Sequence, residues 1–158
     1  MCYNAIVDKT HQVFEEIEQT IRRKGTETGG TIMKEVKFFR CNHCGNLVAK
    51  IHDAGVPLVC CGEKMQELVP GSVDAAVEKH LPVVKVEGDT LTATVGSVEH
   101  PMSEEHWIEW IYVLTDKGGQ RKVLNPGEKP ELTFALGGDK PVAVFAYCNL
   151  HGLWRTDL

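Results

Sequence analysis

The sequence has little of what membrane, nucleic-acid-binding or disordered proteins contain in excess. Aromatic residues make up 7% of the 158 residues, and the 17 basic residues are outnumbered by 22 acidic ones, which gives a formal net charge of −5. No nucleic-acid partner is expected, because such proteins present a basic face. The remaining composition, 42% hydrophobic and 25% charged, is typical of a globular protein and excludes disorder and collagen-like repeats.

Long hydrophobic runs are also missing. The longest candidate, residues 107–114, is interrupted by Glu109 and falls well short of the ~20 residues that a membrane-spanning helix needs. The N-terminal residues lack the apolar core of a secretory signal peptide. We therefore expect no membrane association and a cytoplasmic location, where clustered cysteines more often bind metals than form disulfides.

The first part of the chain divides into two predicted segments. Residues 1–32 form an N-terminal extension, in which residues 8–24 are predicted to be an amphipathic helix and residues 25–30 a flexible linker. Residues 33–69 form a small cysteine-bearing domain with three short strand-like pieces, at 36–39, 47–51 and 65–69. This domain has too few apolar residues for a core and needs a metal or another cross-link.

Residues 70–158 have the pattern of an all-β domain. Short strands alternate with glycine- and proline-rich turns, at a spacing that is typical of an immunoglobulin-like β-sandwich. The predicted strands cover residues 83–87, 90–96, 107–114, 120–124, 131–136 and 142–148. The predicted fold class is therefore mainly β, with a helical N-terminal appendage.

Against this ordinary background, six cysteines and seven histidines are more than packing requires. Four of the cysteines form a first group, Cys41-x-x-Cys44 and the adjacent pair Cys60-Cys61. A C-x-x-C turn brings two thiolates onto one ion, and Gly45 can adopt the positive φ that such a turn often needs. Four thiolates indicate tetrahedral zinc or iron, and the spacing alone does not decide between them.

A second group lies in the β domain and consists of His80, His100, His106, Cys148 and His151. Cys148 and His151 are three residues apart at the end of a predicted strand, a spacing that suits one metal ion. Val142, Val144 and Ala146 precede Cys148 by alternation, so we expect Cys148 to end a core-facing row. Four imidazoles and a thiolate exceed the needs of tetrahedral zinc and indicate a five-coordinate transition metal with an open position.

Together with Glu78-Lys79-His80-x-Pro82, these motifs resemble desulfoferrodoxin, the two-iron form of superoxide reductase. The resemblance covers residues 33–158. It implies a small desulforedoxin-like domain, residues 33–69, followed by a β-sandwich superoxide reductase domain, residues 70–158. It also implies two iron ions per chain.

The resemblance implies a role for each motif residue. Cys41, Cys44, Cys60 and Cys61 hold the first iron, while the four histidines form an equatorial plane around the second iron with Cys148 as its axial ligand. Glu78 is the carboxylate that occupies the sixth position in the oxidised resting state, and Lys79 attracts the superoxide anion. Without the resemblance, Glu78 and Lys79 are simply an exposed ion pair on a loop.

The implied activity is one-electron reduction of superoxide to hydrogen peroxide, without release of dioxygen, with electrons from an external donor such as rubredoxin. A homodimer is also expected. Two alternatives stay open: a rubredoxin-like electron carrier, and a zinc- or iron-binding module without turnover. Neither alternative requires the fifth ligand or the Glu78-Lys79 pair.

Overall fold

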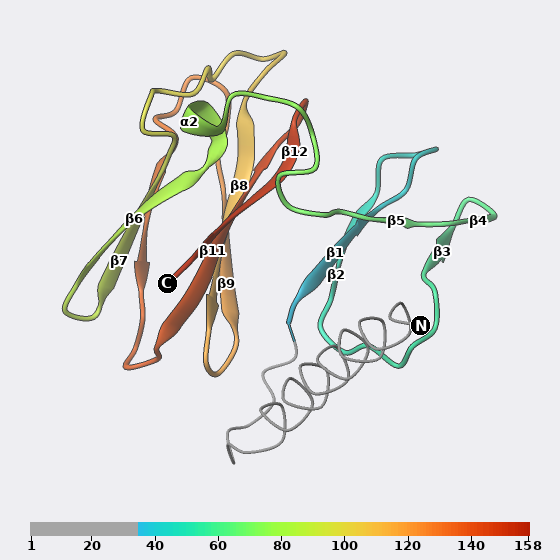
Figure 1. The fold of residues 1–158 in the computed structure, drawn as a ribbon, viewed down its shortest axis with the longest axis horizontal. Helices are drawn as coiled ribbons and strands as arrows, with labels where there is room; N and C mark the ends of the chain where they lie inside the picture. Colours follow the sequence, from blue (N-terminus) through green and yellow to red (C-terminus); the bar gives the residue numbers. More distant parts are fainter. Residues whose placement is uncertain (1–34) are drawn as a thin grey trace, which may run out of the picture. The chain divides into compact units, whose positions relative to one another are not determined.

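The computed structural model describes residues 35–158, which belong to one compact unit. The predicted helix over residues 8–24 and the linker after it lie outside the described residues. Figure 1 shows a small sheet near the start of the described chain and two larger sheets after it. The described part is mainly β, as predicted, and its short helix is α2 (Val77–His80).

The small sheet is antiparallel and has the strand order β2-β1-β5. Its strands are β1 (Lys37–Arg40), β2 (Leu47–Lys50) and β5 (Gln66–Glu67). A separate hairpin joins β3 (Val59–Cys60) to β4 (Glu63–Lys64). β1, β2 and β5 overlap the three predicted pieces, whereas the hairpin of β3 and β4 was not predicted. β3, β4 and β5 have only two residues each and bury few side chains.

Two antiparallel sheets make up the rest of the described chain, in the orders β10-β7-β6 and β12-β11-β8-β9. The first contains β6 (Pro82–Glu87), β7 (Thr90–Val95) and β10 (Glu131–Ala135). The second contains β8 (Ile108–Thr115), β9 (Gly119–Val123), β11 (Pro141–Cys148) and β12 (Gly152–Asp157). Buried residues of both sheets, including Leu91, Ile111, Phe134 and Val144, form one core cluster between them.

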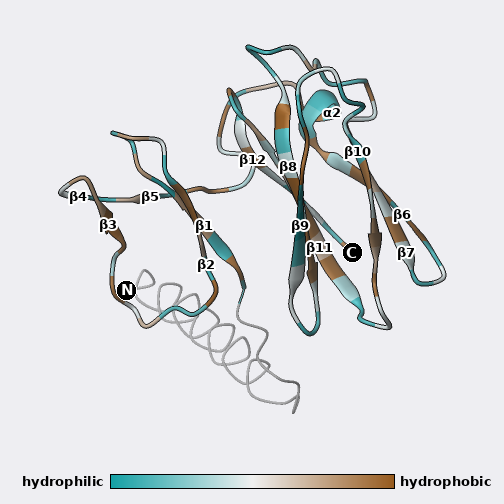
Figure 2. Cartoon of the chain, turned by 180° about the vertical axis from the view of Figure 1, so that it is seen from behind, coloured by the Kyte–Doolittle hydropathy of each residue, from teal (hydrophilic) through white to brown (hydrophobic). Residues whose placement is uncertain are grey.

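The six strands that were predicted in this region are all present, with ends that differ by one residue at most. The prediction missed β12 and the short helix α2. Figure 2 shows the contrast between hydrophilic residues along β9 and hydrophobic stretches along β11. Within the described residues, no helix is both long and apolar enough to cross a membrane.

The four-stranded sheet is covered on its other face as well. Phe38 of β1 packs against Trp110 and Phe145, with ring centroids 5.1 and 5.4 Å apart, in a second buried cluster. Val142 packs with this second cluster, so the prediction that Val142 shares a face with Val144 was wrong. The cause is a register shift between Pro141 and Ala143, which reverses the alternation at the start of β11.

Candidate metal centres

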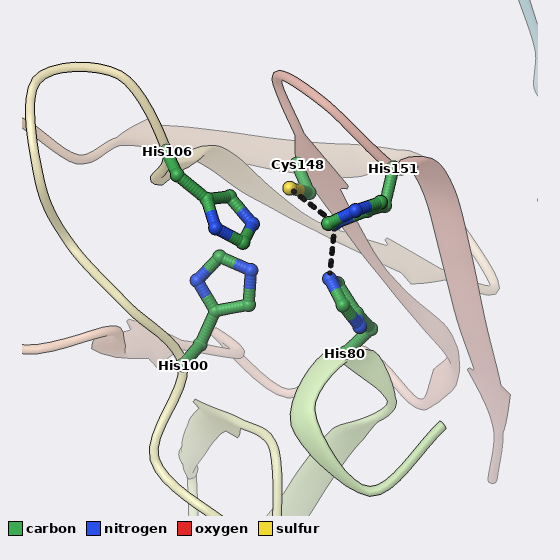
Figure 3. A group of neighbouring side chains, drawn as sticks. All are labelled: His80, His100, His106, Cys148 and His151. Atoms are coloured by element: carbon green, nitrogen blue, oxygen red, sulfur yellow. Dashed lines mark hydrogen bonds between the residues drawn. The ribbon is translucent and has the colours of Figure 1, made fainter. Parts of the chain in front are cut away.

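The five residues of the second group come from three separate segments that meet at one end of the two larger sheets. His80 ends α2, His100 and His106 lie in the connection between β7 and β8, and Cys148 and His151 flank the turn between β11 and β12. Figure 3 shows the four rings and the sulfur directed toward a common centre. Their nearest ligand atoms all lie within 4.8 Å of one another.

A bulge sets the position of Cys148. Tyr147 pairs with Trp110, but Cys148 pairs with Ile108, so Glu109 is an extra residue in β8. Cys148 is fully buried and belongs to the cluster between the two sheets. The sulfur therefore approaches the group from the core side, as the predicted row that includes Val144 and Ala146 requires.

The four imidazoles form a nearly square ring. Neighbouring ring centroids are 4.7, 4.6, 4.8 and 4.7 Å apart in the order His80, His100, His106, His151 and back to His80. The centroids of His80 and His106, which are opposite each other, are 6.3 Å apart. Cys148 Sγ lies 3.6 Å from His151 Nδ1. Four nitrogens around a square and one sulfur match a square-pyramidal ligand set.

Backbone carbonyls fix which nitrogen of two rings faces the centre. His80 Nδ1 donates to the carbonyl oxygen of Ala76 at 2.7 Å, and His100 Nδ1 donates to that of Pro101 at 2.5 Å. The Nε2 atoms of these two rings then carry lone pairs. His151 presents Nδ1 instead, which lies 2.9 Å from His80 Nε2.

Two buried nitrogens show that the group fits a metal ion. Nε2 of His100 and Nε2 of His106 are buried without any hydrogen-bond partner. Buried polar atoms are nearly always satisfied, and an unsatisfied one costs ~1–3 kcal/mol. An ion at the centre of the ring satisfies both nitrogens at once.

The electrostatics agree with this fit. Burial lowers the pKa of His100 to about 4 and also lowers the pKa values of His80 and His106, so these rings are neutral at pH 7 and offer lone pairs. Burial raises the pKa of the Cys148 thiol, although backbone N–H groups of His151 and Leu150 act in the opposite direction. A cation restores the thiolate, and neutral imidazoles with a thiolate suit iron, copper or zinc.

Glu78 and Lys79 lie on α2, directly before His80. Glu78 is exposed and Lys79 is half-buried. The positive charge of Lys79 contributes to the lowered pKa values of both His80 and His106, so this charge is close to the ring of histidines. The structure therefore brings both residues to the edge of the second group.

A turn after β7 holds α2 in place. The carbonyl oxygen of Glu78 accepts hydrogen bonds from Val98 N at 3.0 Å and from Ser97 Oγ at 3.3 Å. Gly96 permits this contact, because a Cβ atom there would lie 2.3 Å from the Val98 oxygen and 2.7 Å from the Lys79 oxygen. The φ of Gly96 is also positive, at +85°.

We expect Gly96→Ala to destabilise the protein by at least ~1 kcal/mol, because the new methyl group combines a steric clash with a strained φ. It should also slow any reaction that depends on Glu78 and Lys79. Thermal unfolding and activity measure the two effects. Gly88→Ala is the matched control, since Gly88 has a positive φ and open space around it. Equal effects of the two changes would contradict a specific role for the turn.

The four cysteines of the first group also converge, with sulfur atoms within 4.8 Å of one another. Sγ of Cys44 is 3.6 Å from Sγ of Cys60, which is 3.9 Å from Sγ of Cys61. All four are free thiols. Gly45 has the expected positive φ, but the second turn places Cys61 itself in the left-handed region, at φ 52°.

The thiols of this group do not ionise together. Hydrogen bonds from backbone groups, chiefly that of Cys44, lower the pKa of Cys41 to about 6, whereas hydrogen bonding with Cys44 raises the pKa of Cys61 to about 12. A metal ion provides the positive charge that stabilises four thiolates side by side. The donor set fits tetrahedral iron or zinc.

Several residues around the second group were not predicted. Trp154 stacks on His80 with ring centroids 4.9 Å apart, and Trp154 Nε1 donates to the carbonyl oxygen of His151. Asn149 hydrogen-bonds to the segment that carries His106. Asn149 lies within Cys148-x-x-His151, so its place in that motif was the available signal. For Trp154 the sequence contains no comparable signal.

The fold and the two groups define a two-centre metalloprotein, with one all-cysteine site on a small sheet and one histidine-rich site on a pair of packed sheets. The desulfoferrodoxin family model matches residues 72–157, and the model of the desulfoferrodoxin N-terminal domain matches residues 33–68. The chain belongs to the desulfoferrodoxin family.

Individual relatives agree with this assignment. The chain is 46% identical over 123 residues to a desulfoferrodoxin of Nitratidesulfovibrio vulgaris, an alignment that covers 78% of this chain and 97% of the relative. A superoxide reductase of Pyrococcus horikoshii is 32% identical over 99 residues, which cover 51% of this chain and 86% of the relative. The crystal structure of the superoxide reductase from Treponema pallidum has a TM-score of 0.67 and 41% identity, and covers 78% of this chain and 100% of that one.

Proposed function

We propose that the protein is a superoxide reductase. Each superoxide takes up one electron and two protons and becomes hydrogen peroxide, and an external donor then returns the electron. The observation that carries the proposal is the square of four imidazoles with a buried cysteine on its core side. The solved relative from Treponema pallidum is named for this activity.

The chain supplies most of what the reaction needs. Bound iron(II) provides the single electron. Four imidazole nitrogens and the Cys148 sulfur would hold the iron, and the thiolate would favour electron donation to the substrate. Lys79 would attract the superoxide anion and assist its protonation, and Glu78 would offer a carboxylate to the oxidised iron. The ligands of this second iron are His80, His100, His106, Cys148 and His151.

The first iron is proposed at Cys41, Cys44, Cys60 and Cys61. We further propose that residues 33–69 form the desulforedoxin-like domain, residues 70–158 form an immunoglobulin-like reductase domain, and residues 1–32 are an extension to them. The two family matches, residues 33–68 and 72–157, support a division near residue 70.

A direct assay tests the function. Purified protein with an electron donor should consume superoxide and form hydrogen peroxide without evolving dioxygen. Stoichiometric release of dioxygen would instead indicate a dismutase. An analysis that finds only zinc would leave the binding-module alternative, and iron at the four cysteines alone would leave the electron carrier.

Lys79→Ala should lower the second-order rate constant for superoxide by ~10-fold at low salt and flatten its dependence on ionic strength, because the positive charge of Lys79 at the edge of the second group steers the anion. Pulse radiolysis at several salt concentrations measures both effects. Lys140→Ala makes the same change in net charge at the opposite end of β11 from Cys148, and should leave the rate unchanged. Identical salt slopes for all three proteins would exclude steering by Lys79.

Three further features are proposed rather than observed: a small electron-transfer protein of the rubredoxin type as donor, a homodimer, and a cytoplasmic location. The small sheet supports the dimer, since its order places β2 at an edge that can pair with another copy. Sedimentation equilibrium of the full chain tests the dimer.

A further inference from the structure

His106 lies outside the strand ladders, in the long connection between β7 and β8. Its nearest backbone contacts are local. His106 N donates to the carbonyl oxygen of Ser103 at 3.2 Å, and Ser103 N donates to the carbonyl oxygen of His106 at 3.0 Å. These two bonds stay within the turn, so they do not fix His106 relative to the other four ligands.

Asn149 supplies that link. Its Oδ1 accepts a hydrogen bond from Trp107 N at 3.0 Å, and its Nδ2 donates to the carbonyl oxygen of Glu105 at 2.8 Å. Its backbone N–H donates to the carbonyl oxygen of Trp107 at 3.2 Å. One side chain therefore binds the residues on both sides of His106.

The position of Asn149 in the chain links these contacts to two other ligands. It directly follows Cys148 and precedes His151 by two residues, so it belongs to the turn that carries two other ligands. Met102 also holds the connection, because its sulfur accepts a hydrogen bond from Ile108 N at 3.4 Å. That contact, however, does not reach the turn of Cys148 and His151.

We infer that Asn149 is a positioning residue that holds His106 against Cys148 and His151 and thereby sets the iron affinity of the second site. The inference rests on the proposed function only in that this site binds iron. Partners that orient metal ligands typically contribute ~10–100-fold to metal affinity. Asn149 does so through the backbone of two neighbours and not through the imidazole itself.

The test is competition for Fe²⁺ between the iron-loaded full chain and graded concentrations of a chelator. Absorption bands of the two centres report the loss of each iron separately, so the four-cysteine site is an internal reference. Asn149→Ala should raise the dissociation constant of the second iron ~10–100-fold and leave that of the first iron unchanged. Asn149→Asp keeps the size of the side chain and the acceptor for Trp107 N, but places a carboxylate oxygen against the Glu105 carbonyl oxygen. It should raise the dissociation constant of the second iron only.

Two controls separate positioning from general stability. Val144→Ala removes buried volume from the core cluster four residues before Cys148, and Glu105→Ala removes an exposed side chain but keeps the carbonyl acceptor. Neither should change iron affinity. If both Asn149 variants keep the affinity of the original chain, or if Val144→Ala matches them, the inference is wrong. An original chain that takes up no iron at the second site would contradict the proposed function itself.

Discussion

Replacing Cys148 by serine is expected to abolish superoxide reduction. The serine hydroxyl is nearly the same size as the thiol, so the fully buried position stays filled and the two packed sheets stay folded. A hydroxyl does not ionise in this environment, however, and is a poor ligand for iron(II). The site loses the sulfur that favours electron donation, so we expect the rate of superoxide reduction to fall at least ~100-fold. Loss of a residue that only orients a metal ligand already costs up to ~100-fold, and loss of the ligand itself should cost more.

Pulse radiolysis of superoxide decay measures this loss, and the absorption spectrum supplies the comparison within one sample. Bands of the four-cysteine centre should be unchanged in Cys148→Ser, while the sulfur-to-iron band of the second centre disappears. Cys44→Ser is the reciprocal control, because it removes a ligand from the other group. Retained activity in Cys148→Ser would remove this cysteine from the mechanism.

Replacing Cys61 by serine is expected to loosen the chain between β2 and β5. Apolar burial does little to hold this segment: the exposed fractions of Ile51, Val56 and Val59 are 86%, 64% and 63%. Metal binding contributes ~10–16 kcal/mol to the folding of small zinc domains. The small apolar area that these side chains bury contributes far less. The left-handed φ of Cys61 destabilises the folded segment by ~1–3 kcal/mol, and metal binding offsets this cost.

Limited proteolysis measures the loosening. Cleavage between residues 51 and 66 should become at least ~10-fold faster in Cys61→Ser, because exposed backbone without a core opens readily. The fragment that contains the second group should stay intact and keep its iron. His43→Ala is the control, since His43 is exposed between Cys41 and Cys44 of the same site and is not one of the four grouped residues. Equal protection of all three proteins would show that the metal does not hold this segment.

Most residues of both metal groups could be predicted, because residue type and spacing determine which side chains can bind one metal ion. Cys41-x-x-Cys44 and Cys148-x-x-His151 each bring two ligands together through a local turn, whatever the rest of the fold does. His100 and His106 were harder, since no short spacing links them to the other ligands. They were grouped by residue type, and the family resemblance then implied their roles. Alternation of apolar residues likewise predicted six of the seven strands in the two larger sheets.

Other features depend on contacts that no local pattern encodes. The segment Gly152–Asp157 was not predicted as a strand, although Leu153 and Trp154 are buried, because it follows the ligand turn without a clear alternation. The side of Val142 was predicted wrongly, since a bulge leaves no trace in apolar periodicity. Asn149 binds the residues on both sides of His106 through tertiary hydrogen bonds, which form only once the chain is folded.

The packing of Phe38 limits how readily the β-sandwich can exist without the cysteine domain. Trp110, Phe145, Tyr147 and Leu153 lie on a face of the four-stranded sheet that Val36 and Phe38 help to bury. A chain that began at residue 70 would lose this cover. Each aromatic side chain buries ~150–250 Å² of surface, so removal of the cover would expose a large apolar patch of the kind that soluble monomers rarely have. A reductase domain without the cysteine domain therefore needs polar replacements on this face of the sheet, or another subunit packed against it.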